Sequence, residues 1–166
     1  MLNITGYTPL QSATGLFWIN ITMLISFFIW GYILPKISEY GISSIKLIKL
    51  GLPISYFSLF LIIYFGNNAG AFLFTLYIMT SIVISLTQPA IALNFSKNLA
   101  GKSLTSYNVF LFSGTFFIQW GIGLVIDLCN NNGFDIVSSY RISFSVFLIL
   151  CVLSYIFFIY LNKNEN

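Results

Sequence analysis

The stretch from Leu50 to Ser96 contains no Asp, Glu, Lys or Arg. Soluble domains carry about 25% charged residues, whereas this chain of 166 residues carries 7% and is 58% hydrophobic. A bilayer core is about 30 Å thick, and a helix needs about 20 apolar residues to cross it. The uncharged stretch holds two runs of that length around one short break, Gly66–Gly70. The sequence therefore predicts an all-α, polytopic membrane protein.

Five apolar runs predict one membrane domain, residues 1–166, that crosses the bilayer five times. The predicted helices cover about residues 15–34, 46–65, 71–95, 103–128 and 140–161. Pro35 and Lys36 are expected to end the first helix. Pro89 lies inside the third helix and should leave the carbonyl of Ser85 without a backbone donor. The third connection is predicted at Ser96–Lys102, and the fourth, Cys129–Ser139, is about as long as the first, Pro35–Ile45.

The lysines indicate the orientation, because cytoplasmic loops carry the excess of Lys and Arg. They flank the first and third connections and follow the last helix: Lys36, Lys46, Lys49, Lys97, Lys102 and Lys163. The fourth connection has Asp127 and Asp135, either of which is an expected partner for Arg141, the single outer cation. We therefore expect the N-terminus outside and the C-terminus in the cytoplasm. The bias toward Ile, Asn, Phe, Tyr and Lys indicates an AT-rich genome and a bacterial inner membrane.

Polar residues inside membrane helices rarely face lipid tails, so their spacing predicts which helix faces turn inward. One face of the fourth helix carries three such residues at spacings of seven and four, and the third helix repeats the pattern. The candidates for lining a substrate cavity are Asn20, Tyr77, Ser81, Gln88, Asn108, Thr115 and Gln119. Hydrogen bonds between helices are the alternative use of these faces. The second and fifth helices are plainer and are expected to lie outside the others.

Two glycines of the fourth helix, Gly114 and Gly121, lie on a different face from its polar residues. They are expected to serve helix packing, because glycine lets a neighbouring helix approach closely.

The residues needed for catalysis or metal binding are largely missing from this sequence. The chain has no histidine, and Cys129 and Cys151 lack the spacing of metal ligands. The sequence also lacks clustered acids and a nucleophile motif, so we expect no enzyme, no metal site and no cofactor. The net charge of +3 is dispersed along the chain, which argues against nucleic acid as a partner.

Three segments together resemble the C-terminal half of a major facilitator superfamily transporter. The first is Gly31-Tyr32-Ile33-Leu34-Pro35-Lys36 followed by Gly41, which is similar to the signature of the cytoplasmic loop between the family's eighth and ninth helices. The second is Ala100-Gly101-Lys102-Ser103-Leu104 with Asn108, Phe112 and Gly114. The third is Gln119-Trp120-Gly121-Ile122-Gly123, ending in Ile126-Asp127-Leu128. The resemblance makes Gly31, Pro35, Lys36 and Gly41 the candidate loop signature.

The resemblance implies that the five helices correspond to the eighth to twelfth of a twelve-helix transporter made of two halves. It implies that the first, third and fourth helices line the substrate cavity, with the second and fifth outside. A half-transporter cannot alternate access without its partner. We therefore expect a missing N-terminal half, with this chain as a fragment; a split protein and an inactive remnant are the alternatives.

The predicted function is part of a secondary transporter that moves an unknown small solute across the lipid bilayer by alternating access. The alternative is a non-transporting integral membrane subunit that uses the same polar faces to hold an assembly partner.

Overall fold

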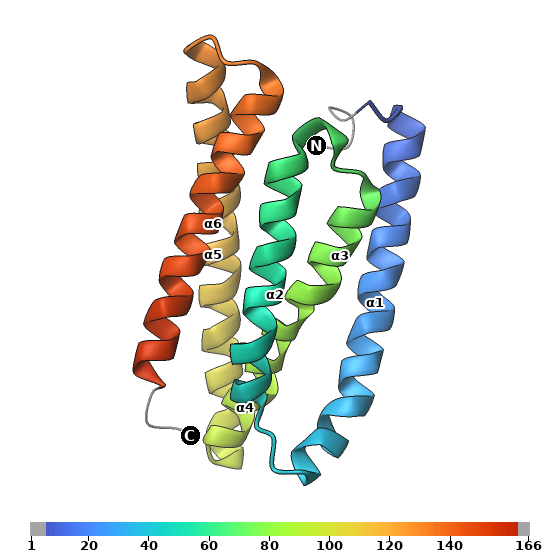
Figure 1. Cartoon of the computed structure of the whole chain (residues 1–166). Coiled ribbons are helices and arrows are strands. Elements are labelled where there is room, and N and C mark those ends of the chain that lie inside the picture. The colour runs from blue at the N-terminus through green and yellow to red at the C-terminus, as the bar shows by residue number, and fades with distance from the viewer. Residues whose placement is uncertain (1–5, 163–166) are drawn as a thin grey trace.

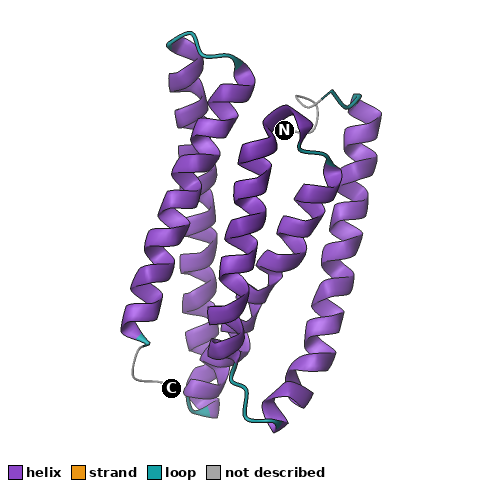
Figure 2. Cartoon of the chain, viewed as in Figure 1, coloured by secondary structure: helices purple, strands orange, loops and turns teal. Residues whose placement is uncertain are grey.

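The computed structural model describes residues 6–162, which form helices joined by short turns (Figures 1 and 2). The elements are α1 (Pro9–Glu39), α2 (Ser44–Phe65), η2 (Gly66–Asn68), α3 (Ala71–Ser81), η3 (Ile82–Leu86), α4 (Thr87–Asn94), α5 (Lys97–Asn131) and α6 (Ile136–Leu161). The segments α3, η3 and α4 together form the third span. Among the described residues, five spans are long and apolar enough to cross a membrane. The predicted all-α class with five apolar helices is confirmed.

The first helix is longer than predicted, because Pro35 and Lys36 do not end it. α1 continues through Pro35 to Glu39. The end comes at Gly41, whose φ of +77° is favourable only for glycine. The Gly41 N–H donates to the Ser38 carbonyl at 3.0 Å, which caps the last turn. Gly41 of the candidate loop signature is therefore a helix stop.

The two connections predicted on either side of the fourth helix, Ser96–Lys102 and Cys129–Ser139, are mostly helical. α5 begins at Lys97, where the Ser96 carbonyl accepts the N–H groups of Leu99 and Ala100 at 2.8 and 2.9 Å. The residues expected to form the connection include good helix formers such as Leu, Ala and Lys, which favour this extension. The helix continues to Asn131 and is followed by Gly133, with φ of +84°.

The start of the last helix is set by Asp135, which is its N-cap. A carboxylate oxygen of Asp135 accepts the N–H groups of Val137 and Ser138 at 3.1 Å each. These donors have no partner within the helix, so the cap satisfies them. α6 therefore begins at Ile136, four residues before the predicted start.

We expect the pKa of the Asp135 carboxyl to lie below its ordinary value of 3.8, because hydrogen bonds from the Ser138 hydroxyl and from backbone N–H groups favour the charged form. The cap therefore stabilises α6 above the ordinary carboxyl pKa and loses this effect as the pH falls through the lowered native value. A carbon-13 NMR titration of Asp135 in detergent micelles measures the shift. Ser138→Ala should move the pKa back toward 3.8. A wild-type midpoint at or above 3.8 would contradict the cap.

The five spans are arranged in two layers. α1 contacts α3 and η3, and α4 contacts α5, so α1, the third span and α5 form one layer. α2 and α6 contact each other and cover one face of that layer, and Figure 1 shows α2 in front of α4 and α6 in front of α5. The two groups are those that differ in polar content, but α1 and α5 are less buried than α2, which is not the expected order. The opposite face of the first layer is not covered by any helix that the structure describes.

α2 is the most buried span, although it was expected to be peripheral. Small residues allow its close contacts. The buried hydroxyls of Ser55 and Ser58 donate to carbonyls of their own helix at 2.8 and 3.0 Å, so they cost no unsatisfied polar group. A Cβ on Gly51 would lie 2.8 Å from a methyl carbon of Val83 in η3. At Gly51, α2 and η3 therefore approach closely, as glycines in membrane helices allow.

The outside of the bundle is apolar, which suits lipid better than water. In α5, which is described along its whole length, no residue is buried, and Phe110 is 78% exposed. Phe28 of α1 is 72% exposed. Soluble monomers rarely leave such continuous apolar surface in water. The packing therefore agrees with the membrane setting that the composition predicts.

The charged side chains collect at the two ends of the helices. One end carries Glu39 and the described lysines, Lys36, Lys46, Lys49, Lys97 and Lys102. The other end carries Asp127, Asp135 and Arg141. Lys163 lies outside the described residues. This segregation has the form that the positive-inside rule requires; which end faces the cytoplasm stays a prediction.

Candidate functional site

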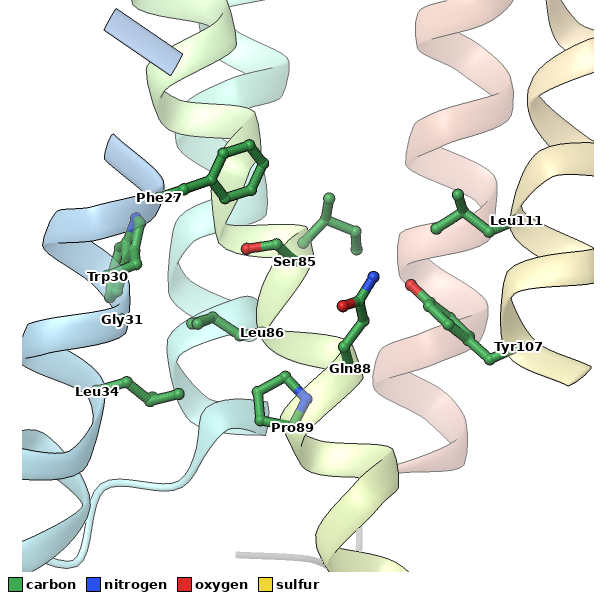
Figure 3. Close-up of a pocket in the computed structure, with 11 residues that line it drawn as sticks. Phe27, Trp30, Gly31, Leu34, Ser85, Leu86, Gln88, Pro89, Tyr107 and Leu111 are labelled. Carbon is green, nitrogen blue, oxygen red and sulfur yellow. The ribbon is translucent and has the colours of Figure 1, made fainter. Parts of the chain in front are cut away.

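A cavity of about 570 Å³ lies on the uncovered face of the first layer, between α1, the third span and α5 (Figure 3). Its lining is mostly apolar and aromatic, with three polar side chains, those of Ser85, Gln88 and Tyr107. The other lining residues are Phe27, Trp30, Gly31, Leu34, Ile84, Leu86, Pro89 and Leu111. Small-molecule sites have this size and this combination of apolar walls with a few polar groups.

The cavity forms where the third span departs from α-helical geometry. Pro89 has no N–H, so the Ser85 carbonyl loses the donor that an α-helix would provide. The preceding residues Ile82–Leu86 form a 3₁₀ segment instead, and the Thr87 N–H bonds to the carbonyls of Ile84 and Ser85. The expectation of a free Ser85 carbonyl is therefore wrong. The Ser85 carbonyl therefore accepts a backbone hydrogen bond despite the proline. The Ser85 side chain lines the cavity.

The 3₁₀ segment also changes which residues of the third span share a face. A 3₁₀-helix has 3.0 residues per turn instead of 3.6, which adds about 20° per residue, or about 100° over a five-residue segment. Tyr77 and Ser81 lie before the segment and Gln88 lies after it, so their α-helical spacing no longer aligns them. Tyr77 is half-buried and does not line the cavity. Gln88 lines the cavity.

Gln88 is the polar group best placed to bind a ligand. Its side chain is exposed, and within residues 6–162 its amide has no hydrogen-bond partner. The amide offers two donor hydrogens and one acceptor oxygen. Figure 3 shows it pointing toward the Tyr107 side chain of α5. The Tyr107 hydroxyl is 2.5 Å from the Thr87 hydroxyl, a hydrogen bond that fixes α4 against α5.

The other polar candidates line no part of this cavity, and several bond within their own helices. The side chains of Asn20, Ser81 and Thr115 donate to carbonyls three or four residues earlier, at 2.7, 3.0 and 2.8 Å. Asn108 is half-buried and Gln119 is exposed, and neither amide has a partner among the described residues. The structure therefore contains no hydrogen bonds between helices from these five side chains, within the part of the chain that it describes.

Two of these side chains lie on the same side of α5 as a lining residue, although they do not line the cavity. Leu111 lines the cavity, and Thr115 and Gln119 follow it at intervals of four residues, which places them on the same side of the helix. On α1, Asn20 lies seven residues before the lining residue Phe27, about two helical turns, and so lies on the same side of the helix. These residues extend the open face toward the opposite end of the bundle.

Gly114 and Gly121 were expected to allow close helix packing, and the structure does not show it. No atom lies within 4 Å of a Cβ built on Gly114 or Gly121, so no described helix packs closely against them. Gly121 instead borders a small apolar cavity of about 200 Å³ between α5 and α6. Gly31 of the candidate loop signature lies in α1 and lines the main cavity. Lys36 donates to the Tyr32 hydroxyl at 2.8 Å, one helical turn away.

Sequence reasoning missed the aromatic part of the cavity, Phe27, Trp30 and Tyr107. Aromatic residues make up 19% of the chain, so their presence in a helix carries no signal of a site. The usable signal was Pro89, which marks the break. The residues one turn to either side of a proline in the middle of a span are the ones to examine first.

A comparison with protein-family models found no match, and neither did searches of curated proteins and of solved structures. The proposed function therefore rests on the cavity and on the arrangement of the spans.

Proposed function

We propose that this chain is part of a secondary transporter of the major facilitator type, and that α1, the third span and α5 form its side of the solute pathway. The observation that carries the proposal is the cavity of about 570 Å³ on the uncovered face of these three elements. The lysine-rich end would lie in the cytoplasm of a bacterial inner membrane. Alternating access would come from movement of this bundle against a second one.

The broken third span supports this proposal. In secondary transporters, substrate sites lie near the middle of the membrane and are often built from discontinuous helices. Here η3 occupies the middle of the third span, with eleven residues of α3 before it and eight of α4 after it. The cavity is lined by the residues of this break and by those that follow it.

The lining indicates the class of solute. It contains no charged side chain, so an ion would enter without a counter-charge. The Gln88 amide and the Ser85 and Tyr107 hydroxyls can hydrogen-bond a polar group, while Phe27 and Trp30 can cover an apolar one. We infer a small, uncharged, partly polar solute.

A second wall of the pathway would come from another bundle, either an N-terminal half of the same protein or a separate subunit. The exposed row of Thr115 and Gln119 on α5 would face it. The same exposed row also favours the second candidate function, a non-transporting membrane subunit that holds an assembly partner. The two functions differ in whether the cavity opens to both sides of the membrane.

Thiol accessibility tests this difference. In protein expressed from its native gene, with Cys129 and Cys151 replaced by serine, Gln88→Cys should react with a membrane-impermeant methanethiosulfonate. Alternating access predicts reaction in both right-side-out and inside-out vesicles, because the cavity opens to each side in turn. The rate is measured by blocking of later labelling with a fluorescent maleimide.

The matched control is Phe110→Cys, which lies on α5 three residues from Tyr107. Phe110 is highly exposed but does not line the cavity, so its replacement should face lipid and react at least about tenfold more slowly, because thiolates form poorly in apolar surroundings. Reaction of the Gln88→Cys thiol from one side only would favour the non-transporting subunit. Equal rates at positions 88 and 110 would show that no aqueous cavity exists.

A further inference from the structure

Another cavity, of about 460 Å³, lies at the opposite end from the lysines, beside the first turns of α6. It is separate from the solute pathway. Its lining changes from polar to apolar along one face of α6. Ser138 and Arg141 lie in the first turns of the helix, Ile142 and Ser145 follow, and Val146 and Ile149 extend into the span. Spacings of three and four residues keep all six on one side of the helix.

Arg141 is held in place by the end of α2. Its Nε–H donates to the Ile63 carbonyl at 2.9 Å, in the last turn of that helix. Its side chain passes over Gly66, whose φ is +51°, and a Cβ on that glycine would lie 3.1 Å from the Arg141 Cδ. The absence of a side chain at Gly66 therefore makes room for the arginine. The guanidinium is fixed at the edge of the cavity before any ligand arrives.

The guanidinium also has no acidic partner in the described part of the chain. Among residues 6–162 it forms no ion pair with Asp127 or Asp135, the partners that the sequence favoured. The Asp135 carboxylate bonds to the backbone at the start of α6 instead. Arginine has five N–H donors, and the Ile63 carbonyl accepts only one of them. The remaining N–H groups have the planar arrangement that suits two oxygens of one phosphate.

We propose that this cavity binds an anionic phospholipid, with the headgroup phosphate on Arg141 and an acyl chain along Ile142, Val146 and Ile149. A free phosphate ion would use only the polar part of the cavity. The continuous apolar face below the cation is what favours a lipid. The Ser138 and Ser145 side chains line the same cavity, and the Ser145 hydroxyl donates to the Arg141 carbonyl at 2.8 Å. The cavity lies where a helix enters the membrane, which is the depth of lipid headgroups.

Native mass spectrometry of the full chain in detergent tests the proposal, with dioleoyl phosphatidylglycerol as the probe and dioleoyl phosphatidylethanolamine as the comparison lipid. We expect phosphatidylglycerol to bind more tightly to the wild type. Arg141→Gln should weaken that binding about tenfold, as loss of a charge-assisted hydrogen bond does. Lys46→Gln removes one charge at the opposite end and should leave the binding within about twofold of the wild type.

A second variant tests the acyl-chain part without removing the charge. Ile149 is 58% exposed, so Ile149→Trp should fold and should obstruct the apolar face, again weakening phosphatidylglycerol binding. Unchanged binding in both Arg141→Gln and Ile149→Trp would overturn the proposal. Displacement of the lipid by millimolar inorganic phosphate would replace it with a free-phosphate site. Equal binding of phosphatidylglycerol and phosphatidylethanolamine would overturn the proposal that the cavity selects an anionic lipid.

Discussion

Gly51→Ala should lower the free energy of unfolding by about 1–3 kcal/mol, the usual cost of overpacking a well-packed contact. The new methyl group would lie 2.8, 2.9 and 3.1 Å from three carbons of Val83, closer than carbon atoms normally approach. Val83 is β-branched and 3% exposed, so it cannot move away by changing rotamer. The loss is measured by unfolding the detergent-solubilised protein in increasing sodium dodecyl sulfate, followed by circular dichroism.

Gly101→Ala in α5 is the control, because it makes the same chemical change where a Cβ has nothing within 4 Å. Alanine favours a helix over glycine by about 1 kcal/mol, so this variant should be equal to the wild type or more stable. The double variant Gly51→Ala/Val83→Ala should recover part of the stability by opening the contact. Stabilisation by Gly51→Ala alone would show that α2 and η3 do not pack as closely as described.

Gly31→Phe should close the cavity without unfolding the protein. Gly31 lines the cavity, and a Cβ at this position meets no atom within 4 Å, so the larger side chain has room to enter. Once there, it would occupy space beside Gln88 and exclude water and solute. Combined with Gln88→Cys, it should slow the reaction of the new thiol with the methanethiosulfonate reagent by about tenfold or more, since thiol reactivity depends on access.

The matched control is Gly123→Phe, another helical glycine with open space around a Cβ. It lies twelve residues beyond Leu111 on α5, about 18 Å along the helix, and does not line the cavity. The thiol introduced by Gln88→Cys should react at its original rate in this background. A fast reaction in the Gly31→Phe background would mean that the reagent reaches position 88 by a route that does not pass α1.

The five spans could be predicted because their signal is additive over many residues. The charge-free stretch from Leu50 to Ser96 holds most of two spans, α2 and the third. Helix ends were harder, because they depend on single residues. Pro35 looked like a stop, but a proline can lie inside a helix whose neighbours tolerate it, and the glycine six residues later is the true end. Asp135 looked like a loop charge and is a cap.

The candidate site could be predicted only in part, and Gln88 is the residue that the structure places on the cavity. Its expected neighbours Tyr77 and Ser81 were assigned by α-helical spacing, which fails across a 3₁₀ segment. The segment Ile82–Leu86 is a run of apolar residues with one serine, and this composition does not distinguish a 3₁₀-helix from an α-helix. The contact of Arg141 with the end of α2 joins residues 78 positions apart, and no periodic pattern can predict it.

On either side of η3 the third span has a different neighbour within its layer, while α2 packs against all three segments. α3 packs on α1, whereas α4 packs on α5 and is joined to it by the Thr87–Tyr107 hydrogen bond. A tilt of α1 relative to α5 would therefore pull the two segments in different directions. The backbone would then bend at the five residues of η3. Three of them, Ile84, Ser85 and Leu86, line the cavity.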